Sequence, residues 1–157
     1  MVNSIGLPRF LAHPRSHSAK LSGMRRSSLF SGLCEKELSR LAAFLDEVTV
    51  PAGTVLVREG RRNDAFWLVL EGTARVSIRG RERRTIGPGG HFGATSMLDG
   101  LGASATVVAG TPLHALVAGA AQFGGLEANP EVSARMRAES EKRLRSDLMA
   151  VVSEPAL

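Results

Sequence analysis

Four histidines are the first candidates for metal binding or proton transfer, because imidazole does both near neutral pH. His13 and His17 lie near the N-terminus, His91 follows two glycines, and His114 lies in an apolar segment. The four are scattered along the chain, and no second type of metal ligand clusters beside them. The sequence therefore predicts no metal site.

Cys34 and Ser96 are the candidate nucleophiles. Cys34 is the only cysteine, which excludes an intramolecular disulfide and a cysteine-based zinc cluster, and no base lies near it in the sequence. Ser96 lies within residues 93–97, which lack the strand–turn–helix context of a nucleophile elbow. We therefore predict no catalytic residue and no enzymatic activity. The single cysteine fits a reducing cytoplasm.

The positive charge of the chain lies in its first residues. The 157 residues carry 20 Lys and Arg against 15 Asp and Glu, a net charge of +5. Residues 1–26 hold five of the basic side chains and no acidic one, so the rest of the chain is balanced. We predict a disordered basic leader over 1–26, with a transit peptide or a weak phosphate-binding arm as alternatives. A second basic cluster is predicted to be a solvated hairpin: Arg79, Arg81, Arg83 and Arg84.

Residues 100–126 contain no charged side chain, and these 27 residues are long enough to span a bilayer. Pro112, His114 and several glycines interrupt the segment. We expect two short strands, within residues 104–109 and 113–117, separated by a turn at 110–112. No membrane span is predicted.

Apolar periodicity predicts a mainly β chain with flanking helices. Residues 33–45 have the 3.6-residue spacing of a short amphipathic helix, with Ser31 as its N-cap. Residues 46–117 read as about eight short strands with turn signals every 8–12 residues. A weak helix over 118–128 and a longer one from Pro130 to about Val152 follow.

The long C-terminal helix carries a narrow apolar stripe: Val132, Met136, Leu144, Leu148 and Val151. Two alternatives stay open, because the stripe could pack on its own β domain or pair with the same helix of a second subunit. On the other faces, Glu139 with Arg143 and Glu141 with Arg145 have the favourable i,i+4 order.

Several motifs occur in the order and at nearly the spacing seen in cyclic-nucleotide-binding domains. They are Leu29–Leu33, Val50–Leu56, Arg58–Gly60, Phe66–Gly72, Gly90–Gly93 and Ser104–Ala109. Over residues 28–150 the chain resembles the sensor half of a catabolite-activator-type transcription regulator. The resemblance implies an eight-stranded β-roll, a jelly-roll-like barrel, with a short N-terminal helix and C-terminal helices. The predicted units are the leader at 1–26, the roll with its helix at 27–128, and the terminal helix at 129–157.

The resemblance also places a ligand pocket and puts its usual chemistry in doubt. The implied pocket positions are Phe92, Gly93, Ala94, Thr95, Ser96, Ala103, Ser104 and Thr106. In the family, a Glu accepts from the ribose 2′-hydroxyl at the position of Ala94. An Arg pairs with the cyclic phosphate at the position of Ala103. Both positions are alanine here. If the pocket has a replacement charge, we expect it from Arg58, Arg61 or Arg62 on a neighbouring loop.

We therefore expect a stand-alone regulatory module with a non-cAMP ligand or a protein partner. No cofactor is expected, and a cyclic nucleotide is disfavoured without being excluded. The alternatives are a cyclic-nucleotide receptor with replacement contacts and a transcription-regulator-derived protein without its helix-turn-helix domain. The chain ends near the long helix, so no sequence-specific DNA binding is expected of it. A homodimer through residues 130–152 is the expected self-association, and no membrane contact is expected.

Overall fold

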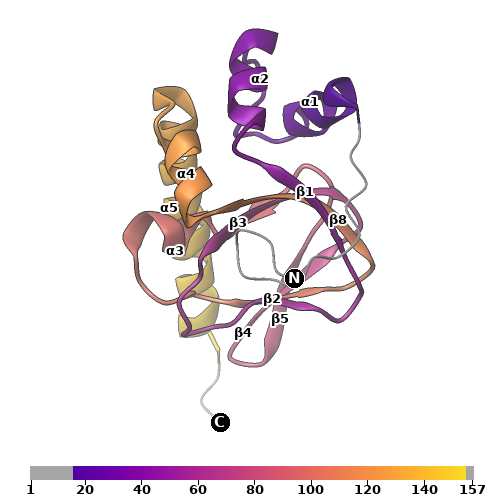
Figure 1. Ribbon diagram of the computed structural model, residues 1–157. Helices are drawn as coiled ribbons and strands as arrows, with labels where there is room; N and C mark the ends of the chain where they lie inside the picture. Colours follow the sequence, from indigo (N-terminus) through magenta and orange to yellow (C-terminus); the bar gives the residue numbers. More distant parts are fainter. Residues whose placement is uncertain (1–15, 155–157) are drawn as a thin grey trace.

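The computed structural model describes residues 16–154 (Figure 1). These residues form two β-sheets, with helices before and after the strands in the chain. The helices are α1 (His17–Arg25), α2 (Glu35–Ala42), α3 (Ala94–Asp99), α4 (Ala120–Glu127) and α5 (Pro130–Val152). The strands are β1 (Asp46–Val50), β2 (Val55–Val57), β3 (Ala65–Glu71), β4 (Ala74–Ile78), β5 (Arg81–Ile86), β6 (His91–Phe92), β7 (Thr106–Ala109) and β8 (Leu113–Gly119). The eight predicted strands are confirmed.

Two four-stranded antiparallel sheets form the roll, in the orders β1-β8-β3-β6 and β2-β7-β4-β5. The sheets face each other and do not close into a continuous barrel. Between them lies one apolar core, in which Trp67 stacks on Phe92. A second core lies between the first sheet and the helices and includes Phe66 and Leu68. Alternate residues of β3 therefore serve the two cores, which explains its unbroken apolar sequence.

The apolar segment at 100–126 is not a membrane helix, and β7 and β8 confirm the two predicted strands within it. Among residues 16–154, no helix combines the length and the apolar character that a bilayer crossing requires.

The first predicted helix is α2, which buries Leu38 and Leu41 against the roll. Its predicted N-cap, Ser31, is wrong. The helix begins after Cys34, which takes the N-cap position without a side-chain hydrogen bond. Residues 29–33 instead continue a turn-rich segment, in which the Ser31 N–H donates to the Ser27 carbonyl at 3.0 Å.

The prediction of a disordered leader over 1–26 is wrong for its second part. Residues 17–25 form α1, and its side chains Leu21 and Met24 are buried in the core beneath α2. Lys20 ties the two helices together, because its Nζ donates to the Ala42 and Leu45 carbonyls at 2.7 and 2.6 Å. Ala42 is the last residue of α2 and Leu45 follows it in the next turn. An ammonium group beside these carbonyls therefore stabilises the C-terminal end of the helix. Residues 1–15 lie outside the described part of the chain.

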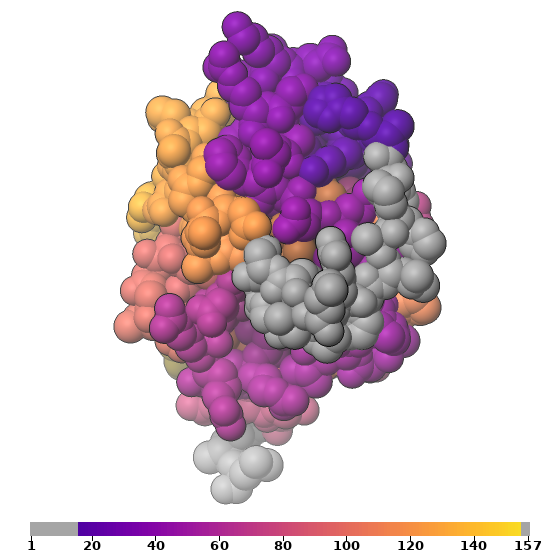
Figure 2. Space-filling view, viewed as in Figure 1, coloured from indigo at the N-terminus to yellow at the C-terminus, as the bar shows by residue number. Residues whose placement is uncertain are grey.

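The C-terminal helices run along the side of the roll. Figure 2 shows the orange surface of the C-terminal helices beside the purple surface of the segment around α2. A Cβ at Gly125 of α4 would lie 2.3 Å from the ring of Phe44, which follows α2. Helix α5 has the predicted bounds, and its N-cap Asn129 accepts from the Glu131 and Val132 N–H groups at 3.1 and 3.0 Å. The apolar stripe of α5 divides in two. Val132 and Met136 are buried in the chain's own core, whereas Leu144 and Leu148 are exposed.

We predict that Lys20→Met lowers the free energy of unfolding by about 1–3 kcal/mol, because it removes two hydrogen bonds from a charged donor and keeps the apolar stem. Urea denaturation followed by Trp67 fluorescence measures the change. Lys36→Met is the matched control, since Lys36 is exposed on α2. Equal stability of the two variants would contradict the role given to Lys20.

Candidate functional site

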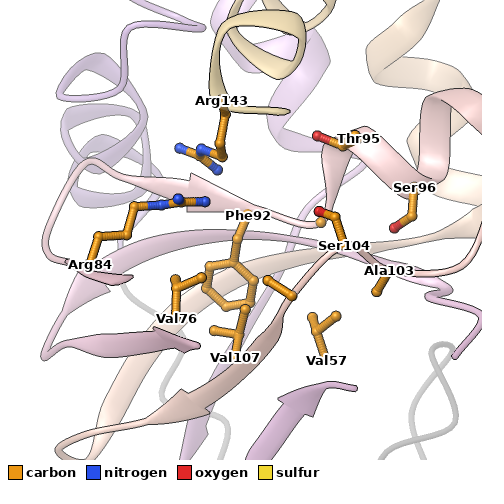
Figure 3. A pocket seen from close by; sticks show the side chains of 12 residues that line it. Val57, Val76, Arg84, Phe92, Thr95, Ser96, Ala103, Ser104, Val107 and Arg143 are labelled. Atoms are coloured by element: carbon orange, nitrogen blue, oxygen red, sulfur yellow. The ribbon is translucent and has the colours of Figure 1, made fainter. Parts of the chain in front are cut away.

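A small hollow of about 40 Å³ lies between the β-roll and α5 (Figure 3). Six of the eight predicted pocket residues line it: Phe92, Gly93, Thr95, Ser96, Ala103 and Ser104. Val57, Val76 and Val107 form its apolar floor together with Phe92. The structure thus brings most of the sequence-predicted positions to one place.

The other two predicted positions, Ala94 and Thr106, do not line the hollow. Ala94 is buried in the core that packs against the helices. The Thr106 hydroxyl accepts a hydrogen bond from the Glu59 N–H at 3.0 Å, on the loop that follows β2. Neither residue lines the hollow, and their part in ligand binding stays a prediction.

Gly93 starts the segment that forms one wall of the hollow. Its φ of +93° is in the left-handed region, and a Cβ there would lie 2.3 Å from the Ala65 carbonyl oxygen. Asn63 fixes the same segment, because its side-chain amide donates to the Gly93 carbonyl and to the Ser96 hydroxyl, both at 3.1 Å. Ser96 is therefore a hydrogen-bonded structural residue, with no base against it.

Two arginines that the sequence analysis did not assign to the site lie at one end of the hollow. Arg84 reaches it from β5 and Arg143 from α5, with their guanidinium groups directed toward each other (Figure 3). Arg143 donates to the His91 carbonyl at 2.6 Å. Burial lowers the pKa of Arg143, and the positive charge of Arg84 lowers it further. An anion at this position would be attracted by Arg143 in a partly dehydrated place, and it would compete for Arg84 with the carboxylate described next.

Asp147 is the internal partner of these arginines. Its carboxylate, only 6% exposed, accepts two hydrogen bonds from the Arg84 guanidinium, the longer at 3.3 Å. A second ion pair joins Arg83 to Glu154 beyond the end of α5. The prediction of a solvated hairpin is therefore wrong for Arg83 and Arg84, whose charges hold α5 against the roll.

The sequence did contain a signal for Arg84. In the sequence of β5, Arg84 lies two residues before Ile86, whose side chain is buried in the interior of the roll. Alternate residues of a strand share one face of a sheet, so this spacing also directs Arg84 inward. The arginines named in the sequence analysis as replacement charges, Arg58, Arg61 and Arg62, do not reach the hollow. They line a different cavity between β2 and β3.

His91 connects the roll to the middle of α5. Its ring is buried beside Phe66, with the ring centroids 5.8 Å apart, and its Nε2 lies 3.4 Å from the Glu139 carboxylate. The Ser28 hydroxyl donates to the same Glu139 oxygen at 2.7 Å. Glu139 therefore contacts His91 and Ser28. Among the described residues, Glu139 and Arg143 do not form the predicted i,i+4 ion pair. The pair of Glu141 with Arg145 is present at 3.2 Å.

The remaining candidates lie apart from the hollow. The His114 Nε2 lies 2.6 Å from the Glu47 carboxylate across β1 and β8, and the His17 ring hydrogen-bonds the Ser39 hydroxyl at 2.9 Å. Cys34 is exposed. His13 lies outside the described residues. Within residues 16–154, no three His, Cys, Asp or Glu side chains gather as a metal site would require.

The family model, the curated relatives and the solved structures that match this chain all indicate the same family. The cyclic nucleotide-binding domain family matches residues 47–129. A cyclic nucleotide-gated potassium channel of Mesorhizobium japonicum is 35% identical over 106 residues, which are 67% of this chain and 29% of the channel. The cAMP-dependent protein kinase regulatory subunit of Yarrowia lipolytica is 34% identical over 98 residues, 61% of this chain and 26% of that protein.

Among solved structures, the catabolite activator protein of Thermus thermophilus superposes with a TM-score of 0.69 at 27% identity. The match covers 80% of this chain and 62% of that protein. The chain spans between 14% and 29% of the length of the curated relatives it matches.

We predict that stability falls as the pH decreases, because burial lowers the pKa of His91 below its ordinary value of 6.5. The unfolded chain then takes up a proton at a higher pH than the folded chain. The free energy of unfolding therefore declines below pH 6.5, by at most about 1.4 kcal/mol per pH unit, until the folded imidazole is protonated. A hydrogen bond with His91 lowers the pKa of Glu139, which adds a further loss below 4.5.

Urea unfolding at a series of pH values measures this dependence. His91→Gln should flatten the decline that begins below 6.5, whereas His17→Gln, at an exposed site, should leave it unchanged. An unaltered slope in His91→Gln would contradict the assignment to His91.

Proposed function

The chain belongs to the cyclic nucleotide-binding domain family, and from this premise we propose that it is a regulatory module whose pocket binds a small anion other than cyclic AMP. The observation that carries the proposal is the pair of guanidinium groups, Arg84 and Arg143, at the hollow beneath α5. Burial and the charge of Arg84 both lower the pKa of Arg143. A bound anion would offset both effects, because it stabilises the charged guanidinium group.

The side chains at the usual contact positions argue against ordinary cyclic-AMP recognition. Ala94 and Ala103 stand where the resemblance places the ribose-binding Glu and the phosphate-binding Arg. A hydrogen bond to a charged group contributes about 1.5–3 kcal/mol, so the loss of both weakens binding by about two to four powers of ten.

The size of the hollow also argues against a bound cyclic nucleotide. Pockets for nucleotide-sized ligands enclose about 300–1,000 Å³, whereas this hollow has about 40 Å³. A small anion needs only to take the place of the Asp147 carboxylate at Arg84. A cyclic nucleotide would require α5 to move away from the roll.

This exchange gives the module a regulatory output. Asp147 holds the C-terminal half of α5 against the hairpin through Arg84. An external anion at Arg84 would leave the buried Asp147 without its cation, which favours an α5 displaced from the hairpin. The chain would then have two states, with α5 docked on the hairpin or displaced from it. Because the ligand binds the displaced state more tightly, ligand binding shifts the position of α5.

The alternative is a true cyclic-nucleotide receptor with replacement contacts. The same two arginines favour it, because they supply positive charge in the pocket that the alanines at 94 and 103 do not. In either case the module is proposed to act by binding and not by catalysis. In support, Ser96 is hydrogen-bonded to Asn63, and Cys34 lies at the start of α2, outside the lining of the hollow.

Calorimetric titration separates the two functions. We expect inorganic phosphate to bind weakly to the full chain, and we expect neither cyclic AMP nor cyclic GMP to bind with a submicromolar Kd. Arg143→Gln should weaken phosphate binding by about tenfold or more, because one charged donor is lost.

Arg145→Gln is the matched control, since Arg145 lies on the exposed face of the same helix. A submicromolar Kd for either cyclic nucleotide would replace the proposal with the alternative. Phosphate binding that is equal in Arg143→Gln and Arg145→Gln would remove Arg143 from the site.

We also propose that the chain forms a homodimer through the C-terminal half of α5. Four apolar side chains are exposed there: Leu144, Leu148, Met149 and Val152. Beside them is a groove of about 220 Å³ lined by Leu144, Leu148 and Val151. The same half-helix of a second copy matches this surface in chemistry, because a two-fold axis brings identical patches together.

Sedimentation equilibrium tests the dimer. The wild-type chain should give a mass of about twice 16.6 kDa, and Leu148→Glu should shift it toward the monomer, because a charge would be buried in the interface. Ser146→Glu adds the same charge at an exposed position about 200° away around the helix and should leave the mass unchanged. A monomeric wild-type chain would overturn this assembly.

A further inference from the structure

A second and larger cavity, of about 430 Å³, lies between β2 and β3. Its apolar wall includes Val55, Leu56 and Trp67, and its polar wall is the loop of residues 58–64. It shares only Val57 with the hollow beneath α5. Its volume is in the range of sites that hold small organic molecules, about 300–1,000 Å³.

Trp67 forms part of the apolar wall of this cavity. The side chain is fully buried and stacks on Phe92, with centroids 5.9 Å apart and ring planes 11° apart. Its indole N–H has no hydrogen-bond partner. The indole nitrogen is buried away from the cavity, so the ring reports on binding without donating to the bound molecule.

The loop beside Trp67 supplies uncompensated positive charge. Arg58 and Arg61 leave one tight turn, in which the Arg61 N–H donates to the Arg58 carbonyl at 3.0 Å. Arg62 is neutralised by Asp64 at 2.9 Å. Within residues 16–154, neither Arg58 nor Arg61 has a side-chain hydrogen bond or an ion pair. Two guanidinium groups therefore remain for an anion, and this group binds carboxylates through paired N–H donors.

We propose that this cavity is a binding site for a small organic anion with an apolar body. The body would lie against Val55, Leu56 and Trp67, and its anionic group would bind Arg58 and Arg61. This site is separate from the one proposed beneath α5, because Arg84 and Arg143 do not line it.

The single tryptophan makes the site directly observable. In a ¹H–¹⁵N correlation spectrum of the full chain, Trp67 gives the one indole N–H peak. Titration with sodium benzoate should shift this peak to saturation. Benzyl alcohol, the uncharged analogue of similar shape, should bind about tenfold or more weakly, because it cannot pair with the arginines.

The double variant Arg58→Gln with Arg61→Gln should weaken benzoate binding by about ten- to a hundredfold. Arg40→Gln with Arg81→Gln removes the same charge from two exposed positions elsewhere and should bind as the wild type does. The same spectra show whether each variant is folded. The proposal is overturned by an unshifted indole peak, by equal binding of benzyl alcohol, or by equal affinities of the two double variants. These outcomes are independent of the phosphate titration, which reports on Arg143.

Discussion

One buried carboxylate, Asp147, sets the position of α5 and with it the shape of the hollow. Its ion pair with Arg84 links the helix to the hairpin of β4 and β5, and Arg83 with Glu154 extends the link. Earlier in the helix, Arg143 contacts the His91 backbone carbonyl and Glu139 contacts the His91 ring. Polar contacts therefore hold the C-terminal part of α5, whereas apolar packing of Val132 and Met136 holds its start. A charged ligand can compete with the first kind of contact and not with the second.

The roll depends on β3, which contributes to both apolar cores. Phe66 and Leu68 face the helices, and Trp67 and Val69 face the interior of the roll. The stack of Trp67 on Phe92 separates the two cavities, since Trp67 lines the larger one and Phe92 lines the hollow. A change at either ring is thus transmitted to the other cavity through direct packing, because protein interiors are close-packed.

Local signals predicted the fold well. The alternation of Val48 with Val50, and the N-cap Asn129 followed by Pro130, are set by neighbouring residues, so β1 and α5 could be read from the sequence. Helix α1 was missed because Leu21 and Met24 are too few to form an apolar face alone and are buried only through contact with distant elements. Arg84 was missed for a related reason, since its partner Asp147 lies 63 residues further along the chain. The pocket positions beside Gly93 were predicted through the resemblance. Arg143 of α5 was not, because its place at the hollow depends on tertiary packing.

The two arginines at the hollow also constrain which sequences can descend from this one. Arg84 and Arg143 lie in the same lining as Ala103. An arginine arriving at position 103 would be a third guanidinium group in one small space, where like charges repel strongly at low dielectric. The side chains tolerated at positions 84, 103 and 143 therefore depend on one another, and an arginine at 103 is compatible with this pocket only if one of the other two is replaced.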